Sequence, residues 1–468
     1  MAEHIRPTRN RREFVADAFC GFGALALASL DARAAVKNPL APKAPHMAAK
    51  AKSVIFLFMA GGPSQVETFD PKPLLNQLHG QKRPKEFGEA KYQFVAPNAT
   101  LLGTKRTFQK YGKSGIEVSD LFPHMSSIVD ELAVLRGCHG DMVVHSAAQY
   151  QLMTGRILPG FPNMGSWVTY GLGSESESLP AYCVLPDPKG ALEAGQPMYM
   201  QGFLPAVYQP TMLRSGAKPV LNLDLPNGVT FGQRKETLDF LRGLNEAAMK
   251  PGDSELEARI AAYDLAFRMQ SEAPEAFDIS KETEETRTLY GIGKAETDDY
   301  GRRCLLARRM VERGVRFTCV VSGGGPGNMQ WDAHGDIEEN HLRMAMHTDQ
   351  PVTALIKDLK RRGLLDSTLV LWGGEFGRSP ESQGNKGRDH HNLGFTMWMA
   401  GGGIKGGQVV GATDAIGLRA IERRMHFRDI HTTLLHQLGL SQDALSYLHL
   451  GRRERLTEVH GEVIKEIV

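Results

Sequence analysis

Residues 367–378 read Ser-Thr-Leu-Val-Leu-Trp-Gly-Gly-Glu-Phe-Gly-Arg. The mostly apolar residues 367–372 predict a strand that is buried on both faces of a parallel sheet. Gly373 and Gly374 end this strand directly before Glu375. Residues 53–59 have the same character and run into Ala-Gly-Gly-Pro-Ser at 60–64. Open α/β sheets bind ligands beyond the carboxyl ends of their strands, so we expect a functional site at these glycine turns.

Helical and strand-like segments alternate on both sides of this stretch. Further strands are predicted at 315–321 and 395–400, and helices at 145–155, 298–313, 341–360 and 429–438. Strands that alternate with helices predict an α/β fold, here a three-layer α/β/α sandwich with a mostly parallel central sheet. We expect the domain to span 53–445, with an insertion or substrate-facing region at 163–300 and a polar C-terminal tail at 446–468.

The composition is that of a soluble globular protein. The chain has 468 residues, of which 41% are hydrophobic and 23% charged, with a net charge of +2. A charge so close to zero gives no electrostatic reason to expect a nucleic-acid partner. The four cysteines after residue 37 form no Cys-x-x-Cys pair, which argues against a zinc knuckle or redox motif and leaves one disulfide possible.

The N-terminal residues predict export. Arg11 and Arg12 precede an apolar segment at 16–30, and Ala-Arg-Ala follows at 32–34. This order is typical of a twin-arginine signal peptide, here residues 1–34, and the Ala-, Pro- and Lys-rich residues 35–52 predict a linker. We therefore expect the twin-arginine export machinery as a partner and a periplasmic or extracellular location. The apolar run is too short for a stable membrane span.

Carboxylates and imidazoles recur where strands are expected to end. Residues 331–334 read Trp-Asp-Ala-His and residues 388–391 read Arg-Asp-His-His, on either side of Glu375. Imidazole and carboxylate are ligands of Zn²⁺, Mn²⁺ and Fe, and two-metal versions of such sites act on phosphate or related esters. The alternative is that these are unrelated loop and surface residues.

Two other segments carry candidates. His145 and Ser146 start a predicted helix, where free backbone N–H groups and the helix dipole favour an oxyanion or an activated nucleophile; the alternative for Ser146 is a helix cap. Glu67 and Asp70 follow the first strand, and Asp70 before a proline could instead be a turn residue.

Four motifs carry a family resemblance: Met-Ala-Gly-Gly-Pro-Ser at 59–64, Trp-Asp-Ala-His at 331–334, Gly-Glu-Phe-Gly-Arg at 374–378 and Asp-His-His at 389–391. With them, nearly all of the chain after the signal resembles the bacterial DUF1501 proteins, which are similar to the alkaline phosphatase and sulfatase superfamily. The resemblance implies an alkaline-phosphatase-like sandwich with up to two metal ions and a covalent nucleophile.

The superfamily's functional residues carry over in part. Its Asp and His before the long helix match Asp332 and His334, and its later His matches His390 or His391. Its Asp-His pair is here Glu375-Phe376, and its first Asp is replaced by the Gly61-Gly62 turn, for which Glu67 or Asp70 could substitute. The Leu-Met-Thr-Gly-Arg ending at 152–156 places His145 at the position of the sulfatases' modified cysteine.

These observations predict an exported metal-dependent hydrolase of phosphate or sulfate esters, which binds one or two divalent ions (Zn, Mn, Fe or Ca). One ion would be held by Asp332, His334 and one of His390 and His391, and the other by Glu375 with Asp70. Ser146 is the candidate nucleophile, and His145 could attack or act as the base; a metal-bound water is the alternative.

Arg378 or Lys405 would pair with the substrate, a small anionic ester or a sulfated or phosphorylated glycan, unless both are solvated surface charges. A secreted binding or scaffold protein with a degenerate site is the alternative function. A third hypothesis is a metal enzyme that acts on something other than phosphate or sulfate esters.

Overall fold

The computed structural model describes residues 38–468 except 217–218, 221–224, 226, 250–252 and 326–329. The predicted signal peptide at 1–34 and the first residues of the predicted linker lie outside the described residues. Residues 38–52 run along the surface of the domain, where their backbone N–H groups donate to carbonyls of Leu172, Gln437 and Gly439.

A central sheet of nine strands forms the middle layer. Its order is β12-β4-β11-β8-β1-β7-β5-β6, with β15 paired to β4. Neighbouring strands are parallel except at β11, which runs antiparallel to both β4 and β8. The strands are β1 Ser53–Met59, β4 Leu132–His139, β5 Tyr182–Leu185, β6 Thr211–Met212, β7 Phe317–Ser322, β8 Thr368–Gly373, β11 Phe395–Ala400, β12 Gln408–Val410 and β15 Met425–His426.

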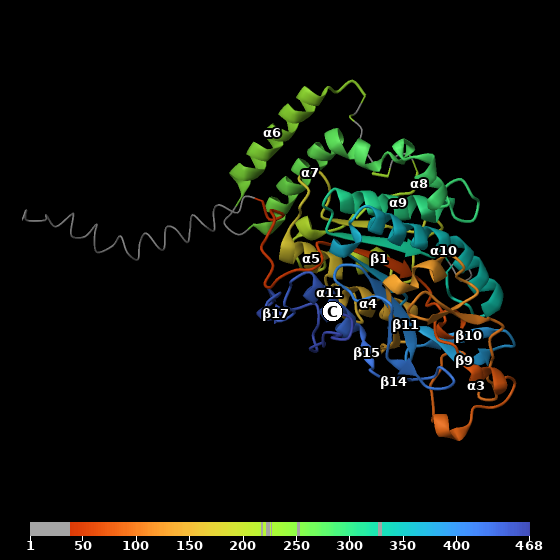
Figure 1. Cartoon of the computed structure of the whole chain (residues 1–468). Helices are drawn as coiled ribbons and strands as arrows, with labels where there is room; N and C mark the ends of the chain where they lie inside the picture. The colour runs from red at the N-terminus through yellow and green to blue at the C-terminus, as the bar shows by residue number, and fades with distance from the viewer. Residues whose placement is uncertain (1–37, 217–218, 221–224, 226, 250–252, 326–329) are drawn as a thin grey trace, which may run out of the picture.

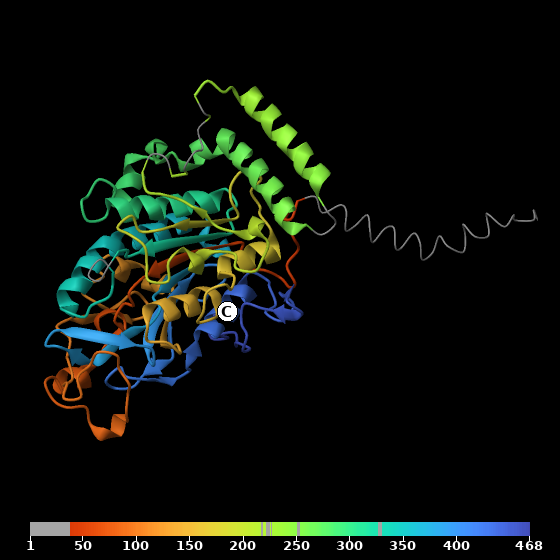
Figure 2. The same ribbon diagram turned by 180° about the vertical axis from the view of Figure 1, so that it is seen from behind.

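Helices cover both faces of the sheet, as the two views of the ribbon show (Figures 1 and 2). The helices are α2 Gln65–Thr68, α3 Pro73–Gln77, α4 His145–Thr154, α5 Met164–Leu172, α6 Phe231–Ala248, α7 Ser254–Phe277, α8 Glu284–Leu289, α9 Asp298–Glu312, α10 Ile337–Arg361 and α11 Phe427–Gln437. Side chains of α7, α9 and α10 pack on one face, and side chains of α4, α5 and α11 pack on the other.

Strand β1 shows why the sheet is buried on both sides. Its residues are all buried, with Leu57 in the core under α9 and α10 and Phe56 in the core under α4, α5 and α11. Burying each such side chain stabilises the fold by roughly 1.5–3 kcal/mol, so the apolar run is stable only between two layers. The predicted α/β/α sandwich with a mostly parallel sheet is confirmed.

The long helix α10 begins four residues before the predicted start. Asp336 is its N-cap, and its carboxylate accepts hydrogen bonds from the backbone N–H groups of Glu338 and Glu339 at 3.1 and 3.2 Å. Such a cap satisfies N–H groups that the first helical turn leaves without partners. The cap also fixes the end of the loop that carries Asp332 and His334.

A β-hairpin at the carboxyl edge of the sheet had no strand prediction. It pairs β9 (Gly377–Gln383) with β10 (Gly387–His391), and its register shifts between Arg388 and His390. The other hairpins are β2 Phe108–Tyr111 with β3 Ile116–Ser119, β13 Ala412–Thr413 with β14 Ala420–Glu422, and β16 Tyr447–His449 with β17 Arg452–Glu454.

The C-terminal residues differ from the expected polar tail. After the β16–β17 hairpin, Leu456, Ile464 and Ile467 are buried in the core beneath α11. Three apolar side chains spaced along an otherwise polar segment suffice to pack it on the domain. The described cysteines are free buried thiols, and within the described residues no helix is both long and apolar enough to cross a membrane.

Candidate metal centre

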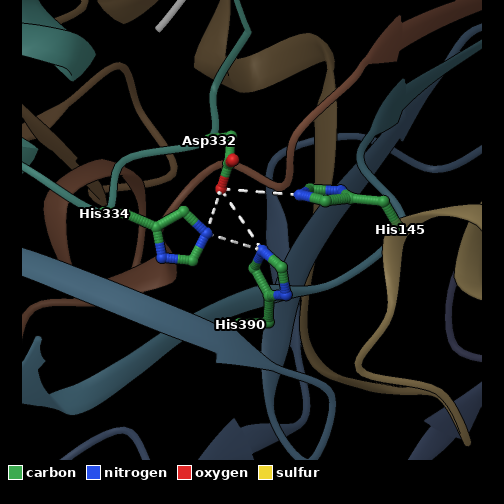
Figure 3. A group of neighbouring side chains, drawn as sticks. All are labelled: His145, Asp332, His334 and His390. Atoms are coloured by element: carbon green, nitrogen blue, oxygen red, sulfur yellow. Dashed lines mark hydrogen bonds and ion pairs between the residues drawn. The ribbon is translucent and has the colours of Figure 1, made fainter. Parts of the chain in front are cut away.

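Four polar side chains converge beyond the carboxyl ends of the strands (Figure 3). His145 is the first residue of α4, Asp332 and His334 lie on the loop between β7 and α10, and His390 lies on β10. One ligand atom from each lies within 4.8 Å of all the others, which makes the group a possible metal site. Among the residues that the structure describes, no other group of three or more histidine, cysteine or carboxylate side chains brings its ligand atoms this close together.

The carboxylate of Asp332 is the centre of this group. Its Oδ1 atom lies 2.9 Å from Nε2 of His334, 3.3 Å from Nε2 of His390 and 3.5 Å from Nε2 of His145. The Nε2 atoms of His334 and His390 are themselves 2.9 Å apart. The Nε2 atoms of all three imidazoles therefore face Oδ1 of Asp332, as the dashed lines in Figure 3 show.

Each imidazole has its other nitrogen bound to an acceptor. Nδ1 of His145 donates to Oε1 of Glu375 at 2.7 Å, and Nδ1 of His390 donates to the carbonyl of Val143 at 2.8 Å. Nδ1 of His334 bonds Oε1 of Gln383. A proton on Nδ1 leaves the lone pair on Nε2, so these outer partners set the tautomer that a metal ion requires. Nε2 of His145 is buried and makes no hydrogen bond, as expected of a nitrogen directed at a cation.

The protonation states follow from the same contacts. Burial raises the pKa of Asp332, but Arg378 and the three histidines outweigh it and hold that pKa well below its usual range. Burial lowers the pKa of His145, yet the neighbouring carboxylates of Asp332 and Glu375 outweigh it and raise the value to about 9. Burial lowers the pKa of His390 to about 4, and the charges of Arg378 and His145 add to that effect. In the absence of a metal ion, His145 is therefore protonated at neutral pH, and its positive charge balances the carboxylates of Asp332 and Glu375.

Arg378 lies behind the cluster and is fully buried. It donates to Oδ1 of Asp332 at 2.7 Å, to the carbonyl of Gly62 at 3.1 Å and to the carbonyl of Gly61. These contacts occupy its guanidinium, so it orients Asp332 and is neither a solvated surface charge nor free to bind a substrate anion.

Two glycines allow the backbone to approach closely enough to build the site. A Cβ atom on Gly61, whose φ is +101°, would lie 2.5 Å from the backbone nitrogen of Asp332. A Cβ atom on Gly387 would lie 1.8 Å from the carbonyl oxygen of His334. Any side chain at either position would displace the loop that carries Asp332 and His334. The Gly61-Gly62 turn therefore supports the ligand loop and supplies no ligand.

The donor set fits a transition-metal ion. Three imidazole nitrogens and one carboxylate oxygen suit Zn²⁺, Mn²⁺ or Fe²⁺, whereas Ca²⁺ prefers six or more oxygen ligands. The orphaned Nε2 of His145 supports the same conclusion. His145, Asp332, His334 and His390 could hold one such ion.

The residues predicted for a second ion are not brought together. Glu375 is fully buried, and its oxygens accept from the backbone nitrogen of Gly61, from His145 and from Gln149. Asp70 pairs with Lys72 at 2.9 Å and accepts from the hydroxyl of Thr413. Glu375 therefore acts through His145, and Asp70 is held in a different polar cluster.

Other predicted residues are placed as follows. Nε2 of His391 bonds the carbonyl of Leu418, so His390 is the member of the pair that joins the cluster. Glu67 forms a buried ion pair with Arg388 at 2.7 Å, and Lys405 is exposed. Ser146 is half-buried in the first turn of α4; Val144 is the N-cap, so Ser146 does not cap the helix.

Sequence reasoning missed the outer partners of the imidazoles. Gln383 bonds His334 and the Val143 carbonyl bonds His390, while Gln149 bonds Glu375 behind His145, and no local pattern marks any of them. It also placed His145 as a nucleophile or base rather than in the ligand set. Because Gln383 closes the strand paired with the Asp-His-His strand, a hairpin prediction over 377–391 could have found it.

A model of the family described as "Protein of unknown function (DUF1501)" matches residues 51–468. The chain belongs to the DUF1501 family. No curated protein matches the sequence of this DUF1501 protein.

Solved structures that resemble this DUF1501 protein include sulfatases and a phosphonate monoester hydrolase. The PsFucS1 sulfatase from Pseudoalteromonas sp. is 12% identical with a TM-score of 0.38, over 97% of this chain and 75% of that chain. A 2-O GAG sulfatase is 10% identical with a TM-score of 0.37, over 89% and 73%. The phosphonate monoester hydrolase of Silicibacter pomeroyi is 11% identical with a TM-score of 0.30, over 74% and 71%.

Proposed function

We propose that this DUF1501 protein is a metal-dependent hydrolase of phosphate or sulfate esters. The convergence of three Nε2 atoms on Oδ1 of Asp332, with every Nδ1 bound to an acceptor, is the observation that carries the proposal. Such a set of lone pairs is costly in a buried site unless a cation satisfies it. An ion held by these four side chains would have to take the ester oxygen as a fifth ligand, the expansion that catalytic zinc sites make in the transition state.

The residues of the site have distinct tasks. His145, His334, His390 and Asp332 would hold the ion, which when bound supplies a Lewis acid to the ester's oxygens. Glu375 keeps the proton of His145 on Nδ1, and Arg378 holds Oδ1 of Asp332 toward the imidazoles. His334 is the most exposed ligand, with 27% of its side chain accessible against 5% for His390, so the substrate would approach at His334.

The substrate class rests on the motifs at 331–334 and 389–391, which resemble those of the alkaline phosphatase and sulfatase superfamily. We take the substrate to be a small anionic ester or a sulfated or phosphorylated glycan. Ser146 is the proposed nucleophile because it follows His145 in the first turn of α4, where a positive helix end favours an alkoxide.

Export is a further part of the proposal. Arg11 and Arg12 before the apolar segment at 16–30 support a twin-arginine signal, and hence a periplasmic or extracellular enzyme. Twin-arginine export carries folded proteins, which suits an enzyme that acquires its ion in the cytoplasm.

The test compares ester hydrolysis by chelator-treated protein with that of protein reloaded with Zn²⁺, Mn²⁺ or Fe²⁺. Substrates would be 4-nitrophenyl phosphate, bis(4-nitrophenyl) phosphate and 4-nitrophenyl sulfate. We expect turnover of at least one that depends on the ion and is lost in His334→Ala but kept in His436→Ala, a histidine on α11 outside the cluster. Ion-loaded, folded protein that hydrolyses none of the three esters would overturn the hydrolase proposal and favour a binding or scaffold protein.

A further inference from the structure

An aromatic side chain stands at the exposed side of the metal cluster. The ring centroid of Phe94 lies 5.4 Å from that of His334 and 6.1 Å from that of His390, in edge-to-face arrangements. Phe94 nevertheless leaves 51% of its surface exposed. The ring of Phe94 therefore lies beside His334, the most exposed of the four ligands.

The backbone of Phe94 is held by the strand that carries His390. Oδ2 of Asp389 accepts from the backbone nitrogens of Phe94 at 2.6 Å and Val95 at 3.1 Å. Oδ1 of the same carboxylate accepts from the backbone nitrogen of His390 at 2.8 Å. Asp389 is fully buried in the bulge of β10, so one carboxylate ties the aromatic loop to a metal ligand.

Further contacts fix the part of the loop that precedes the ring. The hydroxyl of Tyr92 donates to Glu381 of β9, and Arg419 donates to the carbonyl of Glu89. The position of Phe94 is therefore set by contacts of its backbone and of the preceding residues. Its own ring is half exposed and packs little against the rest of the protein. A single exposed apolar side chain is common on protein surfaces. Phe94 differs from the others because its backbone is fixed by the strand that carries a metal-ligand candidate, and sites for ligands are built on such fixed elements.

We propose that Phe94 is a specificity-determining residue that stacks against a ring in the leaving group of the ester. The inference rests on the proposed function, because it places the reacting group at the metal cluster. Aromatic faces bind flat ring faces by offset stacking at centroid distances of about 4.5–7 Å. A ring one or two bonds from the reacting group would lie over Phe94, whereas a methyl group would not reach it.

The test measures binding of non-hydrolysable phosphonates to the full chain loaded with Zn²⁺, by isothermal titration calorimetry. Methylphosphonate reports binding of the anionic group alone. Phenylphosphonate adds an aromatic ring, and cyclohexylphosphonate adds a saturated ring of the size of a sugar. We expect at least one ring to tighten binding by roughly three- to tenfold over methylphosphonate.

Variants assign the effect to Phe94. Phe94→Ala should remove the ring's advantage while methylphosphonate affinity and zinc content stay unchanged, and Phe94→Trp should keep or increase it. Phe231→Ala, at another exposed phenylalanine on α6, is the matched control and should change neither affinity. Loss confined to phenylphosphonate would indicate an aryl ester, and loss that includes cyclohexylphosphonate would indicate a saturated ring.

The outcomes separate the two proposals. Methylphosphonate that binds with the same affinity as both ring compounds, or a ring preference that persists in Phe94→Ala, overturns the role of Phe94 and leaves the hydrolase proposal standing. Zinc-loaded protein that binds none of the phosphonates contradicts the proposed function and this inference with it.

Discussion

The carboxylate of Glu375 lies 2.7 Å from Nδ1 of His145, on the side of the imidazole that faces away from the metal cluster. Glu375 was predicted as a metal ligand, but its oxygens are used by His145, Gly61 and Gln149. Glu375, two residues after strand β8, thus orients a ligand from α4. Such outer carboxylates fix the tautomer of a histidine and raise its basicity.

Glu375→Gln should weaken metal binding by about ten- to a hundredfold without abolishing it. The amide oxygen can still accept from Nδ1 of His145, but it lacks the charge that strengthens the imidazole as a ligand. Competition with a chelator would measure the affinity, and Glu131→Gln, at a surface ion pair with Lys360, is the control. Complete loss of binding in a folded variant would instead assign Glu375 to the ligand set.

Asp332→Ala should destabilise the metal-free fold by about 3–5 kcal/mol, because it leaves the buried charge of Arg378 without its carboxylate. The double variant Asp332→Ala/Arg378→Met should regain part of this loss, since it removes the unpaired charge. Urea unfolding in the presence of a chelator would measure both. A single variant within about 1 kcal/mol of wild type would show that the backbone carbonyls alone satisfy Arg378.

Ser146→Ala tests the proposed nucleophile. We expect ester turnover to fall by at least about a thousandfold while metal content stays at the wild-type level. Ser127→Ala, at an exposed serine of the 3-10 helix before β4, should change neither. A Ser146→Ala protein that keeps more than half of the turnover would place the nucleophile elsewhere.

We expect the stability of the fold to depend on pH through Asp349, independently of any metal ion. Burial raises the pKa of this carboxyl to about 7, although it accepts from the backbone nitrogens of His124 and Met125 at 2.7 Å each. The folded protein therefore binds a proton more tightly than the unfolded chain between about pH 4 and pH 7, and the free energy of unfolding falls as the pH rises through that window.

Asp349→Asn should remove this contribution, on the order of 4 kcal/mol across the window. Urea unfolding of wild type and variant at pH 4.5 and pH 8 would measure it, with Asp366→Asn at an exposed site as the control. Equal pH dependence in wild type and Asp349→Asn would show that Asp349 ionises normally in the fold.

The sheet could be predicted because its strands are apolar on both faces. Strands β1, β8 and β11 are continuous hydrophobic runs and match the predicted segments within a residue. Strand β9 had no such signal, since its buried side chains include Arg378, Ser379 and Glu381. A strand whose polar groups are satisfied by distant partners cannot be found from hydrophobic periodicity.

The sequence predicted the ligands that lie in loops and motifs after the strands. It did not predict the ligand that joins them only through the packing of distant elements. The residues Asp332, His334 and His390 follow strands or lie in recognisable motifs, so their types and positions pointed to a ligand set. The approach of α4, which brings His145 to Asp332 at 3.5 Å, depends on how the layers pack. Asp70 looked equivalent in sequence, but a neighbouring lysine, Lys72, neutralises it.

The most direct test of the metal centre is elemental analysis of the purified protein and its His390→Ala variant, after each is incubated with Zn²⁺, Mn²⁺ or Fe²⁺ and passed over a desalting column. We expect about one equivalent of a transition metal in the wild type and little in the variant, because His390 supplies one of four ligands. A folded wild-type protein that takes up no ion, or a His390→Ala protein that keeps the full equivalent, would contradict it.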